Sequence, residues 1–282
     1  MRQRMVTVVC GITVLIVILL LYKTPVFNIG IALVSVIAAH EILYAVGINK
    51  KKALSAICYA FAALIPFAGY LNFDGICVLL FFAGLLAAFS IMLKEHEDVR
   101  VEKMALCFLI TVLVTVSMSG LIYMRDDIKI NATKDLSLFY ISLAFLCAWI
   151  TDGGGYIFGR LFGKNKLSPK ISPKKTVEGA VGGIISAVVF SVLLLWVYSL
   201  YLSKVGIFAN FNYISLIILS LLCAVVSIIG DLSASIIKRQ NDIKDFGNIL
   251  PGHGGILDRF DSMLFVVPLI VFWVRVFPVV FK

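Results

Sequence analysis

A charged, glycine-rich stretch interrupts the apolar C-terminal part of the chain. It reads Ser235-Ile-Ile-Lys238-Arg239-Gln-Asn-Asp-Ile-Lys244-Asp-Phe-Gly-Asn-Ile-Leu-Pro-Gly-His253-Gly-Gly-Ile-Leu-Asp258-Arg259-Phe-Asp261. Lys and Arg side chains bind phosphate oxygens, Asp side chains hold hard cations, and a Gly/Pro turn lets backbone N–H groups approach an anion. A membrane span needs none of these features. The stretch therefore predicts a phosphate site between two membrane-spanning segments.

The composition is that of a polytopic membrane protein. Of the 282 residues, 61% are hydrophobic and 15% are charged, whereas about half the residues of a soluble domain are apolar. The six cysteines are scattered singly through apolar runs, and their spacing fits neither a metal site nor a disulfide framework. We interpret them as packing residues.

Nine apolar segments have roughly the 20 residues that a helix needs to cross a bilayer, which predicts an all-α fold of about nine transmembrane helices. The segments are Met5–Tyr22, Val26–Gly47, Ala53–Leu71, Gly75–Leu93, Ala105–Met124, Leu136–Phe158, Gly179–Leu202, Ile214–Ile237 and Ser262–Phe281. An odd number of spans places the two termini on opposite faces of the membrane.

The distribution of Lys and Arg predicts the orientation. The N-terminus and every second loop carry eighteen of these residues and the other face carries six, so the positive-inside rule places the N-terminus in the cytoplasm. The net charge of +9 is thereby explained by topology. Aromatic residues do not alternate with the basic ones as a base-stacking surface requires, so we expect no nucleic-acid partner.

The longest loops between spans have only about 20 residues, so we expect no soluble domain. We divide the chain into residues 1–135, with the first five spans, and a catalytic region, 136–282, with the other four. The catalytic region contains two cytoplasmic loops, 160–178 and 238–261. We predict a multi-pass protein of the cell's inner (plasma) membrane. Its active site is predicted to face the cytoplasm.

Charged residues inside spans are costly and commonly functional. Asp152 lies eight residues before Arg160, and Asp231 lies seven before Lys238, so each is about 10–12 Å below the charged boundary of its helix. Both helices run toward the cytoplasm, which predicts a shared cytoplasm-facing cavity. Alternatively, either carboxylate is neutralised by a Lys or Arg of a neighbouring helix. His40 and Glu41 lie near the same face, with no assigned role.

The second basic loop contains Ser172-Pro-Lys174-Lys175-Thr176-Val-Glu178-Gly179. Pro stiffens the approach to the seventh span, and Thr176 or Glu178 is suited to cap that helix. A helix N-terminus beside Lys174 and Lys175 is a ready anion site, although attraction to anionic headgroups is an alternative explanation of the charge. Gly179 and Gly183 form a G-x-x-x-G pattern typical of helix packing.

The types of functional residue in this sequence favour phosphoryl or nucleotidyl transfer as its reaction. Metal-holding carboxylates, several Lys and Arg and flexible glycine loops occur without a nucleophile triad. A phosphomonoester acceptor is already anionic near pH 7, since its second pKa is about 6, and so needs no general base. Such a reaction needs charge neutralisation, because two anions must meet.

The stretch from Ser235 to Asp261 resembles the signature of the phosphatidate cytidylyltransferases, or CDP-diacylglycerol synthases. It matches Ser-x-apolar-Lys-Arg, four residues, Lys-Asp-x-Gly, then Leu-Pro-x-His-Gly-Gly-apolar-x-Asp-Arg-apolar-Asp at every position. The resemblance extends to Asp152-Gly-Gly-Gly-Tyr156 with Gly159-Arg160, and to Ser172–Gly179. One departure is Thr151-Asp152-Gly153, where the family pattern is Ser-Asp-Thr; it removes a hydroxyl and puts a ligand role for position 153 in doubt.

The resemblance implies that phosphatidate attacks the α-phosphorus of CTP, giving CDP-diacylglycerol and pyrophosphate. It implies Mg²⁺, alone or with a second cation, and a homodimer. Metal ligands would be Asp231 and Asp258, with Asp152 and Asp261 as further candidates. The catalytic set would be Asp231, Asp258, Lys238, Arg239 and Arg259. The substrate-binding set would be Asp152, Lys174, Lys175, Thr176, Lys244, His253, Gly254 and Gly255.

Two other functions share some of these features. A CTP-dependent polyprenol kinase would use the same nucleotide in the same membrane setting but would transfer the γ-phosphoryl group to an alcohol; the complete signature argues against it. An ion-coupled transporter also has buried carboxylates and glycine-broken helices. Its charges would lie at the midplane, whereas those of this chain cluster toward the cytoplasmic half.

Overall fold

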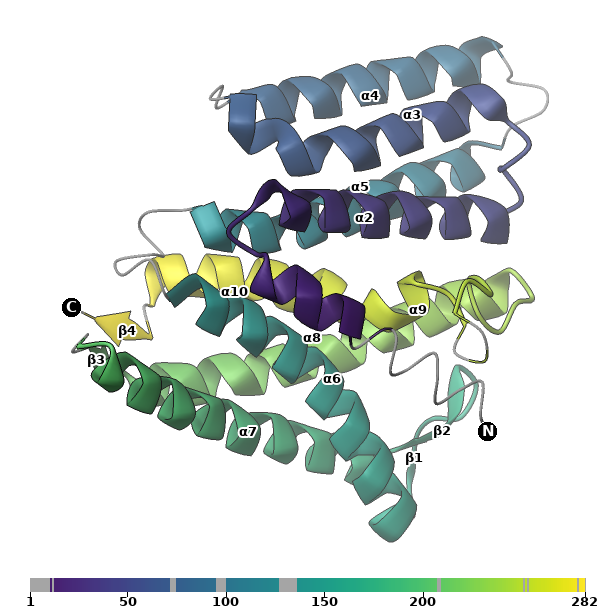
Figure 1. Cartoon of the computed structure of the whole chain (residues 1–282). Helices are drawn as coiled ribbons and strands as arrows, with labels where there is room; N and C mark the ends of the chain where they lie inside the picture. The colour runs from purple at the N-terminus through teal and green to yellow at the C-terminus, as the bar shows by residue number, and fades with distance from the viewer. Residues whose placement is uncertain are drawn as a thin grey trace. The chain divides into compact units, whose positions relative to one another are not determined.

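The computed structural model describes residue 11 and residues 13–71, 75–94, 100–126, 136–206, 209–250, 252, 254–277 and 279–281. These residues form long helices, one 3-10 helix and two small sheets (Figure 1). The chain divides into two compact units. One contains Met1–Ile122 and Lys238–Phe260, and the other contains Tyr123–Ile237 and Asp261–Lys282.

The first unit contains apolar helices and the glycine-rich loop, residues 241–256, which connects α8 to α9. Its elements are α2 (Pro25–Ala45), α3 (Lys52–Leu64), η1 (Ile65–Leu71), α4 (Ile76–Lys94), most of α5 (Val101–Asp126) and the short α9 (Leu257–Phe260). Helix α2 begins where the Thr24 side chain accepts a hydrogen bond from Val26 N at 3.3 Å, with Pro25 in the first turn, where its missing N–H is harmless. Helix α2 packs against α3 and α9.

The second unit contains the other long helices and both sheets. Its elements are α6 (Leu136–Phe162), β1 (Lys166–Ser168), β2 (Ser172–Thr176), α7 (Val177–Lys204), β3 (Asn210–Phe211), most of α8 (Tyr213–Gln240), α10 (Met263–Val276) and β4 (Val280–Phe281). Strands β1 and β2 form an antiparallel hairpin between α6 and α7, and β3 pairs with β4. Helix α6 also packs against α10.

Glycines allow the backbones of α6 and α7 to approach closely. A Cβ placed on Gly179 would lie 2.6 Å from the carbonyl oxygen of Gly155, and one on Gly183 would lie 2.5 Å from that of Thr151. No side chain fits in these spaces. The predicted packing role of Gly179 and Gly183 is therefore confirmed, and the same contact holds the end of α6 beside the hairpin that follows it.

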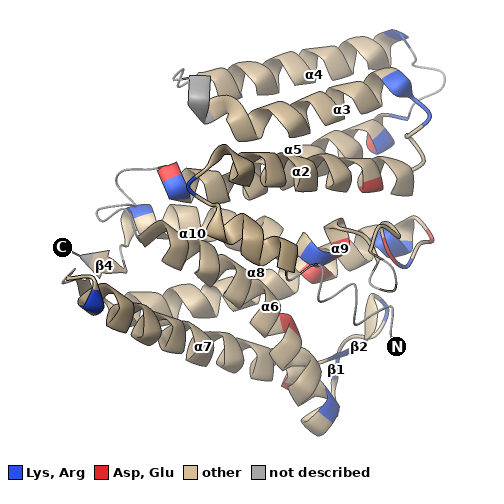
Figure 2. Ribbon diagram, in the orientation of Figure 1, with Lys and Arg blue, Asp and Glu red and all other residues tan. Residues whose placement is uncertain are grey.

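Six helices of the described residues are long and apolar enough to cross a membrane: α2, α4, α5, α6, α7 and α8. The chain is thus a membrane protein, but the count of nine spans is not confirmed. The predicted third span is a 13-residue α3 followed by η1, and the ninth is a 14-residue α10 followed by β4. The predicted first span begins outside the described residues. In Figure 2, charged residues lie mainly at helix ends and in loops.

The all-α prediction is right for the spans and wrong for two connections. The loop predicted at 160–178 contains the β1–β2 hairpin, and the end of the chain pairs as a strand with the segment before α8. Pro169 and Pro173 lie in or beside the hairpin and oppose a helical continuation there, because proline lacks an N–H and restricts the residue before it.

We predict that Gly183→Ala destabilises the protein whereas Gly153→Ala does not. The Cβ on Gly183 meets backbone of α6, and such overpacking costs about 1–3 kcal/mol. A Cβ on Gly153 has nothing within 4 Å, and alanine in a helix is favoured over glycine by about 0.5–1 kcal/mol. Unfolding of the purified variants in detergent measures both changes. Equal effects of the two substitutions would contradict the close-packing account.

Candidate active site

A lysine and two aspartates meet in the second unit. Lys175 of β2 forms an ion pair with Asp231 of α8, and its Nζ lies 3.9 Å from Oδ1 of Asp152 on α6. The three side chains are part-exposed, at 27% for Lys175, 20% for Asp231 and 42% for Asp152. Three separate elements thus place two carboxylates around one ammonium group. A nearby cation is one way to stabilise a carboxylate in an apolar setting, so this arrangement fits both sequence interpretations.

The start of α10 completes this cluster. Ser262 Oγ donates to Oδ2 of Asp152 at 3.2 Å, and the backbone N–H of Ser262 donates to Oδ1 of Asp261 at 2.8 Å. Gly230, next to Asp231, allows α8 to lie close to the backbone at Asp261, because a Cβ on Gly230 would lie 2.9 Å from the carbonyl oxygen of Asp261. The structure therefore brings Asp152, Asp231 and Asp261 to one region of this unit, as the sequence predicted for the first two.

The hairpin is fixed to α7 by two side chains. Thr176 is the N-cap residue of α7 and accepts a hydrogen bond from Gly179 N at 3.1 Å, which confirms its predicted capping role. Glu178 accepts instead from the backbone N–H groups of Lys164 and Asn165, at 3.1 Å each, and from the Asn165 side chain at 2.8 Å. Glu178 thereby holds the first residues of the hairpin beside the last.

Lys174 and Lys175 occupy different environments. Successive side chains of a strand point to opposite faces, so Lys175 faces the carboxylates while the exposed Lys174 points away from them. The sequence had predicted the two lysines as equivalent phosphate contacts. The structure places only Lys175 within an ion-pair network of the described residues.

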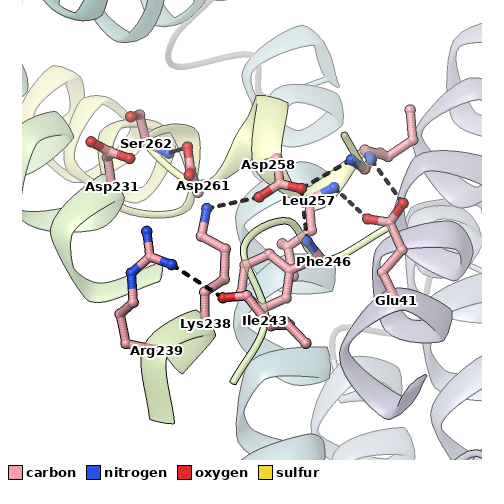
Figure 3. Close-up of polar contacts among 12 residues, drawn as sticks. Glu41, Asp231, Lys238, Arg239, Ile243, Phe246, Leu257, Asp258, Asp261 and Ser262 are labelled. Carbon is pink, nitrogen blue, oxygen red and sulfur yellow. Dashed lines mark hydrogen bonds and ion pairs between the residues drawn. The ribbon is translucent and has the colours of Figure 1, made fainter. Parts of the chain in front are cut away.

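A second cluster forms around Asp258 in the first unit (Figure 3). Its Oδ1 accepts from Nζ of Lys238 at 2.7 Å, and its Oδ2 accepts from the backbone N–H groups of Phe246 and Gly255 at 2.9 Å each. The side chains of Asp258 and Lys238 are 3% and 11% exposed, so the pair is nearly desolvated. Asp258 therefore ties two separate points of the glycine-rich loop to Lys238 in the last turn of α8.

Glu41 of α2 binds the same loop and was not assigned a role from the sequence. Its two carboxylate oxygens accept hydrogen bonds from the backbone N–H groups of Ile256 and Leu257, at 2.9 and 2.8 Å. The only sequence signal was a charge near the end of an apolar span. Nothing in that signal indicates partners more than 200 residues away.

The remaining predicted residues lie on or beside the loop. Arg239 is exposed and donates from Nη1 to the carbonyl oxygen of Ile243 at 3.4 Å, and Lys244 and Arg259 are also exposed. Gly254 has a φ of +82°, which favours glycine, and its carbonyl oxygen accepts from Leu250 N at 3.0 Å. His253 lies outside the described residues.

The donors suit a hard cation but do not form a complete cage. Among the described residues, no group of three or more His, Cys, Asp or Glu side chains is placed to hold a metal ion. Mg²⁺ commonly binds one or two carboxylates together with substrate phosphates and water, and Asp231 with Asp152 fits that requirement. Asp258 already uses three of about four acceptor positions of its carboxylate, so one oxygen position is left for a further ligand.

The chain is similar in sequence to three bacterial phosphatidate cytidylyltransferases, to one over nearly its whole length and to two over about half of it. The phosphatidate cytidylyltransferase of Bacillus subtilis is 34% identical over 98% of both chains. Those of Staphylococcus haemolyticus and Staphylococcus saprophyticus are 38% and 39% identical over 49% of this chain and 50% of each relative. The matched part of the chain thus spans about half the length of these staphylococcal relatives.

A family model described as the cytidylyltransferase family matches residues 2–277. The matched range contains both clusters and all of the described helices, and strand β4 lies beyond it. Together with the similarity to the Bacillus subtilis protein over 98% of both chains, this match shows that the chain belongs to the cytidylyltransferase family.

Proposed function

We propose that the protein is a phosphatidate cytidylyltransferase, which converts CTP and phosphatidate into CDP-diacylglycerol and pyrophosphate for phospholipid biosynthesis. The observation that carries the proposal is a cluster of three charges in a membrane protein. Lys175 of the hairpin lies beside Asp152 and Asp231, which are on long apolar helices. Helix packing alone does not need three such charges. The names of the relatives and the motif from Ser235 to Asp261 support the choice of substrates.

The proposed reaction is an in-line displacement at phosphorus. A phosphate oxygen of phosphatidate forms a bond to the α-phosphorus of CTP, and the bond from that phosphorus to the β-phosphate oxygen breaks, so pyrophosphate leaves. The nucleophile is already an anion, and no side chain has to remove a proton. The main task of the protein is to neutralise and align two anions.

The basic side chains are proposed to divide this task. Lys175 would exchange its carboxylate partners for phosphate oxygens, while Lys238 is held in place by Asp258. Lys174, Arg239, Lys244 and Arg259 are exposed and would supply longer-range attraction for the anions. His253, Gly254 and Gly255 would contact the nucleotide, as the family resemblance implies.

Mg²⁺ is the proposed cofactor, alone or with a second cation. Asp231 and Asp258 would be its ligands by resemblance, with Asp152 and Asp261 as further candidates. When bound, the cation would neutralise charge on the phosphate oxygens. Asp231 and Asp152 would also position Lys175, so that the ammonium group stays near the phosphates when they bind.

The membrane arrangement is proposed from the charge distribution. In this arrangement the protein crosses the plasma membrane about nine times, and its N-terminus lies in the cytoplasm. The active site opens to the cytoplasm, where both soluble CTP and membrane phosphatidate can reach it. A homodimer is proposed from the family resemblance. Light scattering of the purified protein in detergent tests the dimer.

We predict that the purified protein with Mg²⁺ transfers the α-phosphorus label of CTP to phosphatidate and releases the γ label as pyrophosphate. Thin-layer separation of lipid and water-soluble products after incubation with α- or γ-labelled CTP measures both. Polyprenol is offered in parallel as the competing acceptor. Appearance of the γ label on polyprenol would establish the kinase and reject the proposal.

We predict that Asp231→Asn and Lys175→Met each lower kcat/KM by about 100-fold or more, because each change removes a charge proposed to stabilise the reacting anions. The double variant should lose little more than the worse single variant, because both changes remove one ion pair. Asp126→Asn, a carboxylate with a 55% exposed side chain that pairs with Arg125, is the matched control. If the losses of kcat/KM in the two single variants added up in the double variant, Lys175 and Asp231 would act independently. That result would contradict their assignment to one ion pair.

A further inference from the structure

We propose that Glu41 is a positioning residue for the glycine-rich loop, so that α2 controls the conformation in which the loop meets the nucleotide. The nucleotide part of this inference rests on the proposed function. Glu41 does not touch the reacting groups in this account. It acts through Ile256 and Leu257, to which it is hydrogen-bonded (Figure 3).

The Glu41 carboxylate is buried and bonded on both oxygens. The residue is 2% exposed, and each oxygen accepts one backbone N–H, at 2.9 Å from Ile256 and 2.8 Å from Leu257. These donors include the first N–H of α9, so Glu41 caps that short helix from a distant part of the chain. A buried carboxylate is costly without such bonds, so the loop and α2 are coupled.

Two glycines leave room for this carboxylate. A Cβ on Gly247 would lie 2.5 Å from Oε1 of Glu41, and a Cβ on Gly255 would lie 2.5 Å from Oε2. Real Cβ atoms do not approach so closely, so any side chain at either position would displace Glu41 or the loop. Gly247 and Gly255 thus leave the space that the contact with Glu41 requires.

The two buried carboxylates divide three consecutive N–H groups between them. Gly255 N donates to Asp258, and the next two, of Ile256 and Leu257, donate to Glu41. Asp258 in turn binds Lys238. A shift of the Glu41 bonds would therefore also disturb the hydrogen bond that orients Asp258, and through it the Lys238 ammonium.

The first test is hydrogen exchange of the full-length protein in lipid nanodiscs without substrate. In Glu41→Gln, an amide NH₂ replaces one accepting oxygen and faces a backbone N–H. We expect amide exchange within residues 254–258 to increase by about tenfold, as expected for loss of a bond of about 1.4 kcal/mol. The exposed carboxylate of the same unit, changed in Glu102→Gln, is the matched control and should leave exchange there unchanged.

The second test is kinetic. Glu41→Gln should raise the KM for CTP by about tenfold while the KM for phosphatidate changes by less than about twofold, because the loop is assigned to the nucleotide. Loss of thermal stability with both KM values unchanged at a temperature where the variant is folded would show a purely structural role and overturn the proposal. Glu41→Asp, which is shorter but keeps the charge, should recover part of the CTP affinity.

A double variant keeps the test informative if one substitution folds poorly. Gly247→Ala should reproduce the Glu41→Gln defects, because its Cβ would lie 2.5 Å from Oε1 of Glu41. Glu41→Ala removes that clash, so Glu41→Ala with Gly247→Ala should be no worse than Glu41→Ala alone. Independent, additive defects would overturn the coupling.

Failure of the proposed function is distinguishable from failure of this inference, because hydrogen exchange needs no turnover. Suppose that the wild-type protein made no CDP-diacylglycerol while Glu41→Gln still increased amide exchange in residues 254–258. That result would reject the proposed function and support the positioning of the loop by Glu41. Unchanged exchange in Glu41→Gln would overturn the positioning role whatever the activity.

Discussion

The structure depends on how an apolar chain holds charges away from bulk water. A desolvated carboxylate is stable only when a cation or several N–H groups surround it, and each cluster described above meets this requirement differently. Asp231 uses the Lys175 ammonium, Asp258 uses Lys238 together with two backbone N–H groups, and Glu41 uses backbone N–H groups. The charges that we propose for phosphate chemistry thus also hold the local fold. Binding of a phosphate to one of these cations would have to replace a contact that the free protein already makes.

Much of the helical framework could be predicted because apolar length and helix-end chemistry are local properties. Six predicted spans appear as long helices, Thr176 caps α7, and Gly179 and Gly183 mediate close packing. The similar depth of Asp152 and Asp231 in their helices follows from the helix rise alone, and the structure joins both residues through Lys175. Where the required information lies within a few turns of helix, sequence patterns are sufficient.

Contacts between distant segments could not be predicted. The partners of Glu41 are 215 and 216 residues away, and the carboxylate could equally have been solvated at the membrane surface. Glu178 looked like a capping residue but binds the backbone of Asn165, because the intervening residues form a hairpin that charge patterning does not reveal. Hydropathy also could not show that α3 and α10 end early, since η1 and β4 continue with apolar residues.

We propose that Lys175, held by carboxylates in the free protein, is the lysine of the hairpin that binds the nucleotide phosphates. The most direct test is the shift in thermal midpoint caused by CTP with Mg²⁺ in wild type, Lys175→Met and Lys174→Met. At 100 times Kd, binding stabilises the folded state by about 2.7 kcal/mol. We expect a shift of the thermal midpoint in wild type, most of that shift in Lys174→Met, and little in Lys175→Met. An undiminished shift in Lys175→Met would contradict this proposal.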